Sequence, residues 1–291
     1  MKKLSLLPKI LFLSCFCFIA LSFVVKLEPT TVELNQAIKS NQITAEIISN
    51  GKYSGKSVEL SLTNTSKKSL TIKIPAGSAY MPADDGEQTL IQLEEDMIVL
   101  KKGETMKRTI AAFCSEASDG CPSSSSAFSL SATTNDKLKQ MIAYMKGKKI
   151  SKKSYQDAVW AVTDGRSISN IQADDKVTKD FRQYVAKLLG KEDTWYTSPQ
   201  QYSVDPRGNI NSETVVISGE LKFASDGILA IHEEVYDSEG NIMFSSPPGT
   251  PRKSQNVTMK FRIRVQGWEV GTYTVKVMEG DVALKSFPFE V

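Results

Sequence analysis

The sequence predicts a mainly β protein in which two β-sandwiches flank a short helical region. Residues 30–132 and 211–291 contain short segments of alternating apolar and polar residues, separated by turn-forming clusters. Over residues 133–190 the apolar spacing changes to three and four residues, which is typical of amphipathic helices. A chain of 291 residues is long enough for two modest domains with separate cores.

The N-terminal segment has the pattern of an export signal. It begins with two lysines and continues into an apolar run over residues 10–25. A charged start followed by a short apolar run is typical of a secretory signal, and we expect residues 1–22 to be removed after the small-x-small site Ala20-Leu21-Ser22. The alternative is an uncleaved anchor that extends to about residue 26. The sequence therefore predicts a secreted or cell-envelope protein that touches the membrane only through this segment, if it stays uncleaved.

The charge of the exported chain excludes one class of partner. Loss of residues 1–22 removes three lysines and no acidic residue, so the formal net charge of +3 falls to zero. Nucleic-acid binders carry a basic patch that neutralises phosphates, and no such excess remains here. We therefore expect no nucleic-acid partner.

Several catalytic and metal-binding motifs are absent from the sequence. The chain has one histidine, His232, which excludes sites built from several histidines. It has no phosphate-binding glycine loop, no Gly-x-Ser-x-Gly elbow and no Cys-x-x-Cys. We expect no metal, no cofactor and no enzymatic activity. An enzyme that uses carboxylates alone, such as a glycosidase, stays open, but the sequence pairs no two acidic residues.

The predicted strands of the N-terminal sandwich lie between clear turn signals. Asn50-Gly51 and Lys102-Gly103 are two of these signals. Regularly spaced short strands of this kind are typical of a β-sandwich over residues 30–132. The expected strands are 43–49, 58–64, 70–74, 97–100 and 105–113.

Three helices are predicted within residues 133–190. Apolar residues recur at helical spacing in each, as in the run from Leu138 to Met145. Asn135 is the expected N-cap of the first helix, and glycines follow each of the three. We expect this helical subdomain to pack on the N-terminal sandwich.

Residues 191–210 indicate a linker, because they contain Ser198-Pro199 and Asp205-Pro206-Arg207-Gly208. Alternating segments return over residues 211–291, with hairpin turns such as Ser225-Asp226-Gly227 between them. This region resembles an immunoglobulin-like or fibronectin-like sandwich, and that architecture by itself implies no function.

Two cysteines, Cys114 and Cys121, lie outside the export signal. In an oxidising compartment two nearby cysteines favour a disulfide. Asp119-Gly120 would let the short intervening loop turn back sharply enough for the bond. A free thiol at Cys114 is the other outcome of this pattern.

Two short motifs together resemble the thioester domains of bacterial surface adhesins. Phe113-Cys114 ends a predicted strand, and Tyr155-Gln156-x-x-Val159-Trp160 lies on the middle predicted helix. The resemblance implies that the Cys114 sulfur displaces ammonia from the Gln156 side chain, and that the thioester is attacked by an amine on a partner surface. It further implies that Tyr155 and Trp160 exclude water.

The two interpretations of Cys114 are mutually exclusive, because a sulfur bonded to Cys121 cannot also be acylated. Without a thioester, Gln156 would hydrogen-bond backbone where the helices meet the sandwich, and Trp160 would be a core residue.

These observations predict an exported, non-enzymatic protein that binds a protein or glycan surface, with a thioester at Cys114 and Gln156 for covalent capture of amines. The alternative is a structural or scaffolding module of a cell-envelope assembly, in which a Cys114–Cys121 disulfide is a staple.

Overall fold

The computed structural model describes residues 30–224, 227–250, 252–253 and 256–291. The predicted signal peptide or anchor lies outside these residues. Within the described part, no helix has the length and apolar character needed to cross a membrane. The structure is mainly β with a few helices, which confirms the predicted fold class.

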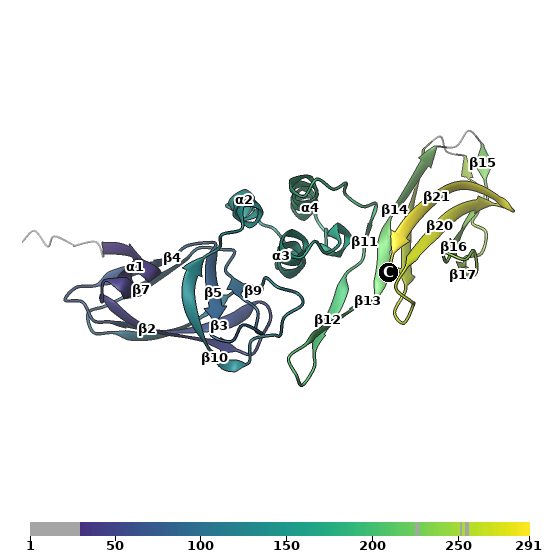
Figure 1. The fold of residues 1–291 in the computed structure, drawn as a ribbon. Helices are drawn as coiled ribbons and strands as arrows, with labels where there is room; N and C mark the ends of the chain where they lie inside the picture. The colour runs from purple at the N-terminus through teal and green to yellow at the C-terminus, as the bar shows by residue number, and fades with distance from the viewer. Residues whose placement is uncertain (1–29, 225–226, 251, 254–255) are drawn as a thin grey trace, which may run out of the picture.

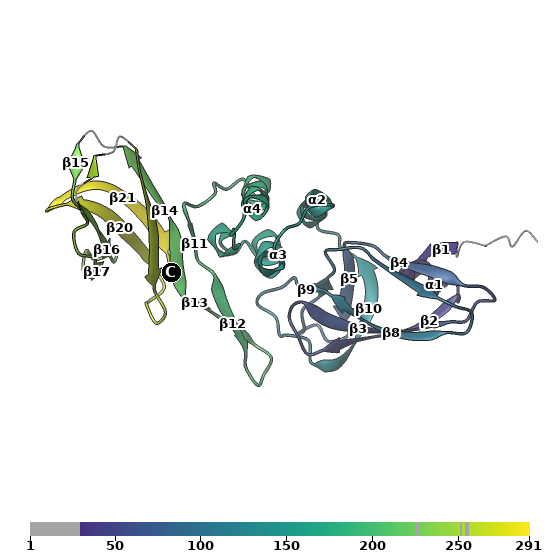
Figure 2. The same cartoon turned by 180° about the vertical axis from the view of Figure 1, so that it is seen from behind.

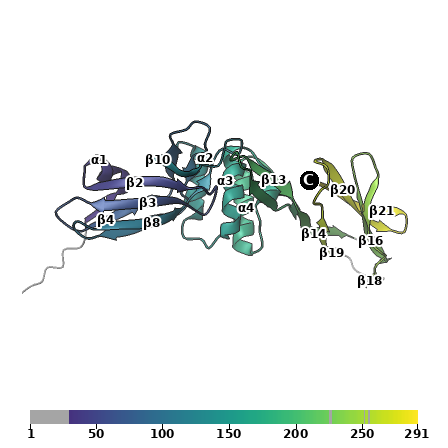
Figure 3. The same cartoon turned by 90° about the horizontal axis from the view of Figure 1, so that it is seen from below.

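The parts of the molecule are arranged in a row. The N-terminal sandwich lies at one end, the helices occupy the middle and a second sandwich lies at the other end (Figure 1). The views from behind and from below show the same order (Figure 2, Figure 3). A hairpin beside the second sandwich extends back toward the first (Figure 1).

The N-terminal sandwich consists of a seven-stranded sheet and a three-stranded sheet. The larger sheet has the order β8-β3-β2-β10-β5-β6-β9, and the smaller has the order β1-β4-β7. The short helix α1 (Leu34–Lys39) follows the first strand. The strands are β1 (Thr30–Glu33), β2 (Ile43–Asn50), β3 (Lys56–Asn64), β4 (Leu70–Ile74), β5 (Ser78–Pro82), β6 (Leu90–Ile91), β7 (Asp96–Leu100), β8 (Thr105–Ala111), β9 (Phe113–Cys114) and β10 (Ser124–Ala132).

The strand predicted over residues 105–113 is divided in the structure. It is broken at Ala112, so that β8 ends at Ala111 and β9 begins at Phe113. The Ala112 amide leaves the ladder and donates to the Gly55 carbonyl, at 2.8 Å. Strands β8 and β9 are therefore consecutive in the chain but stand at opposite edges of the sheet, which must curl to bring these edges together.

Alternating side chains of both sheets form the core of the N-terminal sandwich. Leu60 and Leu62 of β3 and Ile72 and Ile74 of β4 are almost completely buried, as the period of two in a half-buried strand requires. Trp160, from the helical region, belongs to the same core. One helix therefore contributes directly to the packing of the sandwich.

The three predicted helices form as α2 (Asp136–Met145), α3 (Tyr155–Thr163) and α4 (Lys176–Leu188). The Asn135 side chain accepts from the Leu138 amide at 3.0 Å, which confirms the predicted N-cap. Gly147 lies after α2 with a φ of 74°, a left-handed conformation that favours glycine. Helix α3 is buried from Tyr155 through Val162 because it lies between α2, α4 and strand β9.

The stretch 191–210, where the sequence indicates a linker, contains two short strands. These are β11 (Tyr196–Thr197) and β12 (Gln200–Val204), and β12 pairs with β13 (Ile210–Thr214) in an antiparallel hairpin. Asp205 closes the hairpin turn by accepting from the Asn209 amide, and Gly208 has a φ of 86°. The strands are short and lack clean apolar alternation, so only the turn residues were visible in the sequence.

The C-terminal sandwich has a three-stranded sheet with the order β11-β14-β19 and a four-stranded sheet with the order β17-β16-β20-β21. Seven strands divided in this way are found in small immunoglobulin-like sandwiches, as predicted. An additional short pair, β15 with β18, lies beside them. The strands are β14 (Val216–Ala224), β15 (Ile228–Leu229), β16 (Ile231–Tyr236), β17 (Ile242–Ser245), β18 (Arg252–Lys253), β19 (Asn256–Arg264), β20 (Thr272–Glu279) and β21 (Val282–Glu290).

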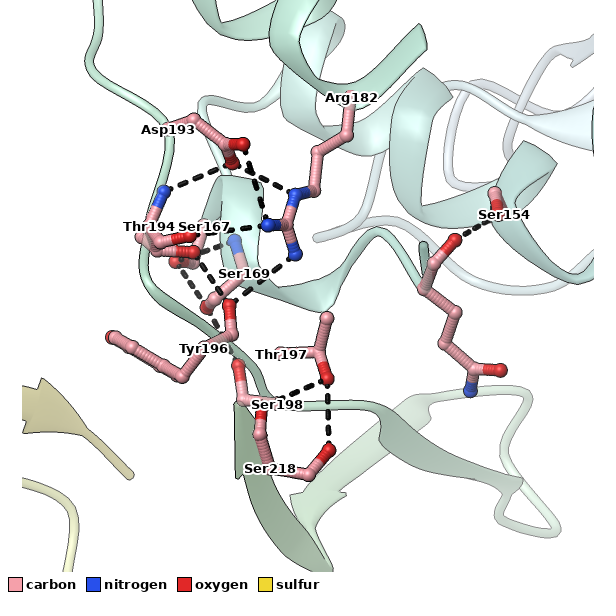
Figure 4. A network of polar contacts seen from close by, with 11 residues as sticks. Ser154, Ser167, Ser169, Arg182, Asp193, Thr194, Tyr196, Thr197, Ser198 and Ser218 are labelled. Atoms are coloured by element: carbon pink, nitrogen blue, oxygen red, sulfur yellow. Dashed lines mark hydrogen bonds and ion pairs between the residues drawn. The ribbon is translucent and has the colours of Figure 1, made fainter. Parts of the chain in front are cut away.

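A buried polar network joins the helices to this second sandwich (Figure 4). The Arg182 guanidinium of α4 pairs with Asp193 at 2.7 Å and donates to the Thr194 carbonyl at 3.1 Å. The hydroxyls of Ser169 and Ser198 lie 2.6 Å apart, between the helical region and the segment that follows β11. These contacts fix the path of the chain between α4 and the sheet.

Candidate functional site

Cys114 lies at the edge of the larger N-terminal sheet. It is the second residue of β9, its neighbour across the ladder is Leu90 of β6, and its side chain has no exposed surface. Its amide donates to the Tyr53 carbonyl at 3.0 Å. The two-residue length of β9 leaves the Cys114 peptide facing the first turn of α3.

Gln156 of α3 lies directly against this peptide. Its Oε1 accepts from the Cys114 amide at 3.2 Å, and its Nε2 donates to the Cys114 carbonyl at 2.8 Å. The carboxamide thus pairs with the edge of β9 as a neighbouring strand would. Only 6% of Gln156 is exposed. The structure therefore brings together the two residues that the sequence singled out, and their recorded contact runs through the backbone of Cys114.

Tyr155 and Trp160, the two residues predicted to exclude water, are both buried but occupy different cores. Tyr155 packs edge-on against Phe113, with ring centroids 5.5 Å apart, and its hydroxyl donates to Glu94. Trp160 is completely buried in the sandwich core that also contains Cys114. They lie on two sides of the helix that carries Gln156.

Two further aromatic residues complete the site, and the sequence did not single them out. Tyr53 lies between β2 and β3, and Tyr202 lies on β12 of the hairpin. Both pack on Trp160, with ring centroids 6.1 Å and 5.0 Å away, and lie 5.9 Å from each other. The Arg166 guanidinium lies over the Trp160 ring at 4.6 Å. We call Tyr53, Trp160 and Tyr202 the aromatic cluster.

Asp157, next to Gln156 on α3, is the buried acid of the site. Burial raises its pKa to about 6, and the Tyr202 hydrogen bond and the Arg166 charge oppose that shift in part. The sequence analysis did not single out Asp157; the signal that could have found it is a polar pair, Gln156-Asp157, in an otherwise apolar helical turn. Burial also raises the pKa of Tyr53; a hydrogen bond with Ser54 opposes that shift, and the charge of Asp157 adds to it.

The Cys114 thiol is uncharged at neutral pH. Burial raises its pKa well above the ordinary value, and the nearby Glu116 acts in the same direction. A thiol is a weak nucleophile in this state. The site therefore protects the sulfur more than it activates it.

The predicted disulfide between Cys114 and Cys121 is not supported, because both cysteines are free and buried. The Cys121 amide donates to the Gly208 carbonyl at 2.8 Å, and its Sγ faces the Gly51 carbonyl at 3.7 Å. Cys114 is held by Gln156 and Tyr53 instead. These separate anchors keep the two sulfurs apart, and burial raises the pKa of Cys121 to about 11.

Other chemistry has few candidate residues. In the described part of the chain, no three His, Cys, Asp or Glu side chains gather in a group that could hold a metal ion. His232 lies on β16, with its Nε2 3.5 Å from Glu234. No nucleophile is recorded in contact with it among the described residues, so it offers no second candidate site.

Comparisons with known proteins identify no family for this chain. No family model and no curated protein sequence matches it. Among solved structures, the CBM51-2 and INT domains from Clostridium perfringens ZmpB align with 10% identity over 85% of this chain and 78% of that chain. The TM-score of 0.19 is too low for that likeness to carry an argument about fold or function.

Proposed function

We propose that this protein is an exported, non-enzymatic surface-binding protein, and that Cys114 and Gln156 form an internal thioester that captures an amine on a protein or glycan surface. One observation carries the proposal: the carboxamide of Gln156 lies against the peptide of Cys114 inside a buried, aromatic site. In such a pair Gln156 would supply the acyl group and Cys114 the sulfur.

The reaction needs no cofactor and no change of oxidation state. The Cys114 sulfur adds to Cδ of Gln156, the Cδ–N bond breaks, and the thiol proton leaves with the nitrogen as ammonia. An incoming primary amine later attacks the same carbon. The C–S bond then breaks, an amide forms and the proton of the amine passes to the sulfur.

The surroundings of the pair suit a bond that water must not reach. Cys114 has no exposed surface and Gln156 very little. Exclusion of water protects a reactive acyl group from hydrolysis while leaving it able to react with a group that is admitted. The Cys114 sulfur is also free, with no disulfide to Cys121.

Intact mass of the purified protein tests the proposal. We expect a mass lower by one ammonia than the sequence requires, and a gain of one methylamine on that mass when methylamine is supplied, with the adduct on Gln156. Cys114→Ser abolishes both effects, and Cys121→Ser, the matched control, leaves both unchanged.

An unshifted mass with a free Cys114 thiol would overturn the thioester. The pair would then be the structural contact of the scaffolding alternative. That alternative has its own support, since both polar atoms of the Gln156 amide already have partners in the Cys114 backbone.

A further inference from the structure

The hairpin formed by β12 and β13 joins the second half of the chain to the cysteine site. It carries Tyr202 and Ile210, which both pack against the core that contains Cys114. Its turn accepts a hydrogen bond from the Cys121 amide through the Gly208 carbonyl, at 2.8 Å. Arg166 also reaches toward it, with its guanidinium 3.5 Å from the Ser212 hydroxyl. The hairpin is thus held at a few separate points, and Figure 1 shows it extending toward the N-terminal sandwich.

Tyr202 is the residue of the hairpin that is most closely integrated into the site. Its ring packs on both Trp160 and Tyr53, and its hydroxyl donates to the buried carboxyl of Asp157. Tyr53 in turn packs against the core cluster that contains Cys114. Removal of Tyr202 would take away its hydrogen bond to Asp157. It would also take away its ring contacts with Trp160 and Tyr53.

The contacts that close this side of the site come from outside the N-terminal sandwich. A cleft of about 630 Å³ lies between the hairpin turn and the loop of Cys121, and Gly208 and Arg207 contribute to its walls. The hairpin is therefore seated at defined points and is not buried along both faces, since Gln201 and Ser203 are exposed. Such an element can lift by breaking a few contacts, without unfolding either sandwich.

We propose that the β12–β13 hairpin is a lid over the Cys114–Gln156 site and that Tyr202 is the residue that determines which reagents reach the sulfur and the acyl carbon. Control of amine capture rests on the proposed function, whereas the covering of the Cys114 thiol does not. The lid makes access to the first sandwich depend on the position of a hairpin that leads into the second.

The rate at which small reagents reach the site tests the lid in either chemical state. If intact mass shows the thioester, the readout is the rate of methylamine addition to Gln156. If it shows a free thiol, the proposed function fails, and the readout becomes alkylation of Cys114 followed by mass spectrometry of its peptide. We expect Tyr202→Ala to raise the rate about tenfold or more, because the aromatic contacts and the hydrogen bond are lost together.

Two further variants make the result decisive. Tyr202→Phe keeps the ring and loses only the hydrogen bond to Asp157, so we expect a smaller but clear increase in rate. Tyr236→Ala removes a tyrosine of β16 in the other sandwich and should leave the rate unchanged. Equal rates for wild type and a folded Tyr202→Ala overturn the lid. Should Tyr202→Ala lose the circular dichroism of the native fold, equal rates for wild type and Tyr202→Phe overturn it instead.

Discussion

The carboxyl group of Asp157 accepts a hydrogen bond from the hydroxyl of Tyr202, a residue 45 positions further along the chain. This contact connects helix α3 to the β12–β13 hairpin, and it is made by an acid that is only 5% exposed. Arg166, Tyr53 and Tyr202 are the titratable groups that face Asp157 from the adjoining segments. The contact therefore couples a titrating group to the seating of the hairpin.

We predict that Asp157 makes the protein more stable in mild acid than at neutral pH. Burial raises its pKa to about 6 in the folded state, above an unfolded value of about 3.9, so the folded state binds the proton more tightly. The stabilisation is complete below about pH 4 and is lost as the pH rises through 6. Asp157→Asn should remove this change of the free energy of unfolding with pH, which amounts to roughly 2 kcal/mol.

Urea unfolding of wild type and variant between pH 4 and 8 measures this effect. Asp237→Asn is a suitable control, because hydrogen bonds from Asn241 hold the pKa of that exposed carboxyl below its ordinary value. Its contribution to the free energy of unfolding therefore changes with pH in the opposite direction. A difference between wild type and Asp157→Asn that does not change with pH would contradict the prediction.

Gln156→Ala should destabilise the N-terminal part of the protein relative to the form in which the Gln156 amide is intact and Cys114 is a free thiol. The substitution removes a donor to the buried Cys114 carbonyl and one of two acceptors for its amide. We expect a cost of about 1–3 kcal/mol, the usual range when a buried polar group loses its partner. Gln140→Ala, on the exposed face of α2, should change the free energy of unfolding by less than about 0.5 kcal/mol.

Chemical denaturation of the two glutamine variants separates these outcomes. If Gln156→Ala is as stable as Gln140→Ala, the carboxamide contact has no structural value. The geometry at Cys114 would then have to be explained by its chemistry alone.

The sequence predicted the elements whose side chains follow a clean period. Strand β4 was found at its predicted bounds, and Asn135 caps α2 as its chemistry requires. The division of one predicted strand at Ala112 was not predictable, because an alanine interrupts no alternation; a distant carbonyl, that of Gly55, draws its amide away. The Gln156 motif was recognised because short spacing along a helix is visible in a sequence, and the Cys114 motif because it ends a predicted strand.

The remaining site residues come from segments without a regular period. Tyr53 lies in a loop, and Tyr202 lies in the stretch that the sequence indicated as a linker. Neither position differs from that of an ordinary surface tyrosine until the hairpin is placed against α3. The disulfide was predicted from compartment and spacing alone, which say nothing about the hydrogen bond that holds the Cys121 amide to Gly208.

We predict that the ion pair between Arg182 and Asp193 is much more sensitive to loss of its acid than an exposed pair of the same kind. The Arg182 side chain is 5% exposed, and Asp193→Ala would leave its charge buried with only backbone carbonyls as partners. We expect a loss of about 2–4 kcal/mol in the free energy of unfolding. The matched control is Asp180→Ala, which breaks the solvent-exposed pair with Lys176 and should cost less than about 1 kcal/mol.

Arg182→Met with Asp193→Ala removes both charges together, so this double variant should recover part of the loss. A double variant less stable than Asp193→Ala alone would show that the carbonyl contacts of Arg182, and not its pairing with Asp193, hold the helices to the second sandwich.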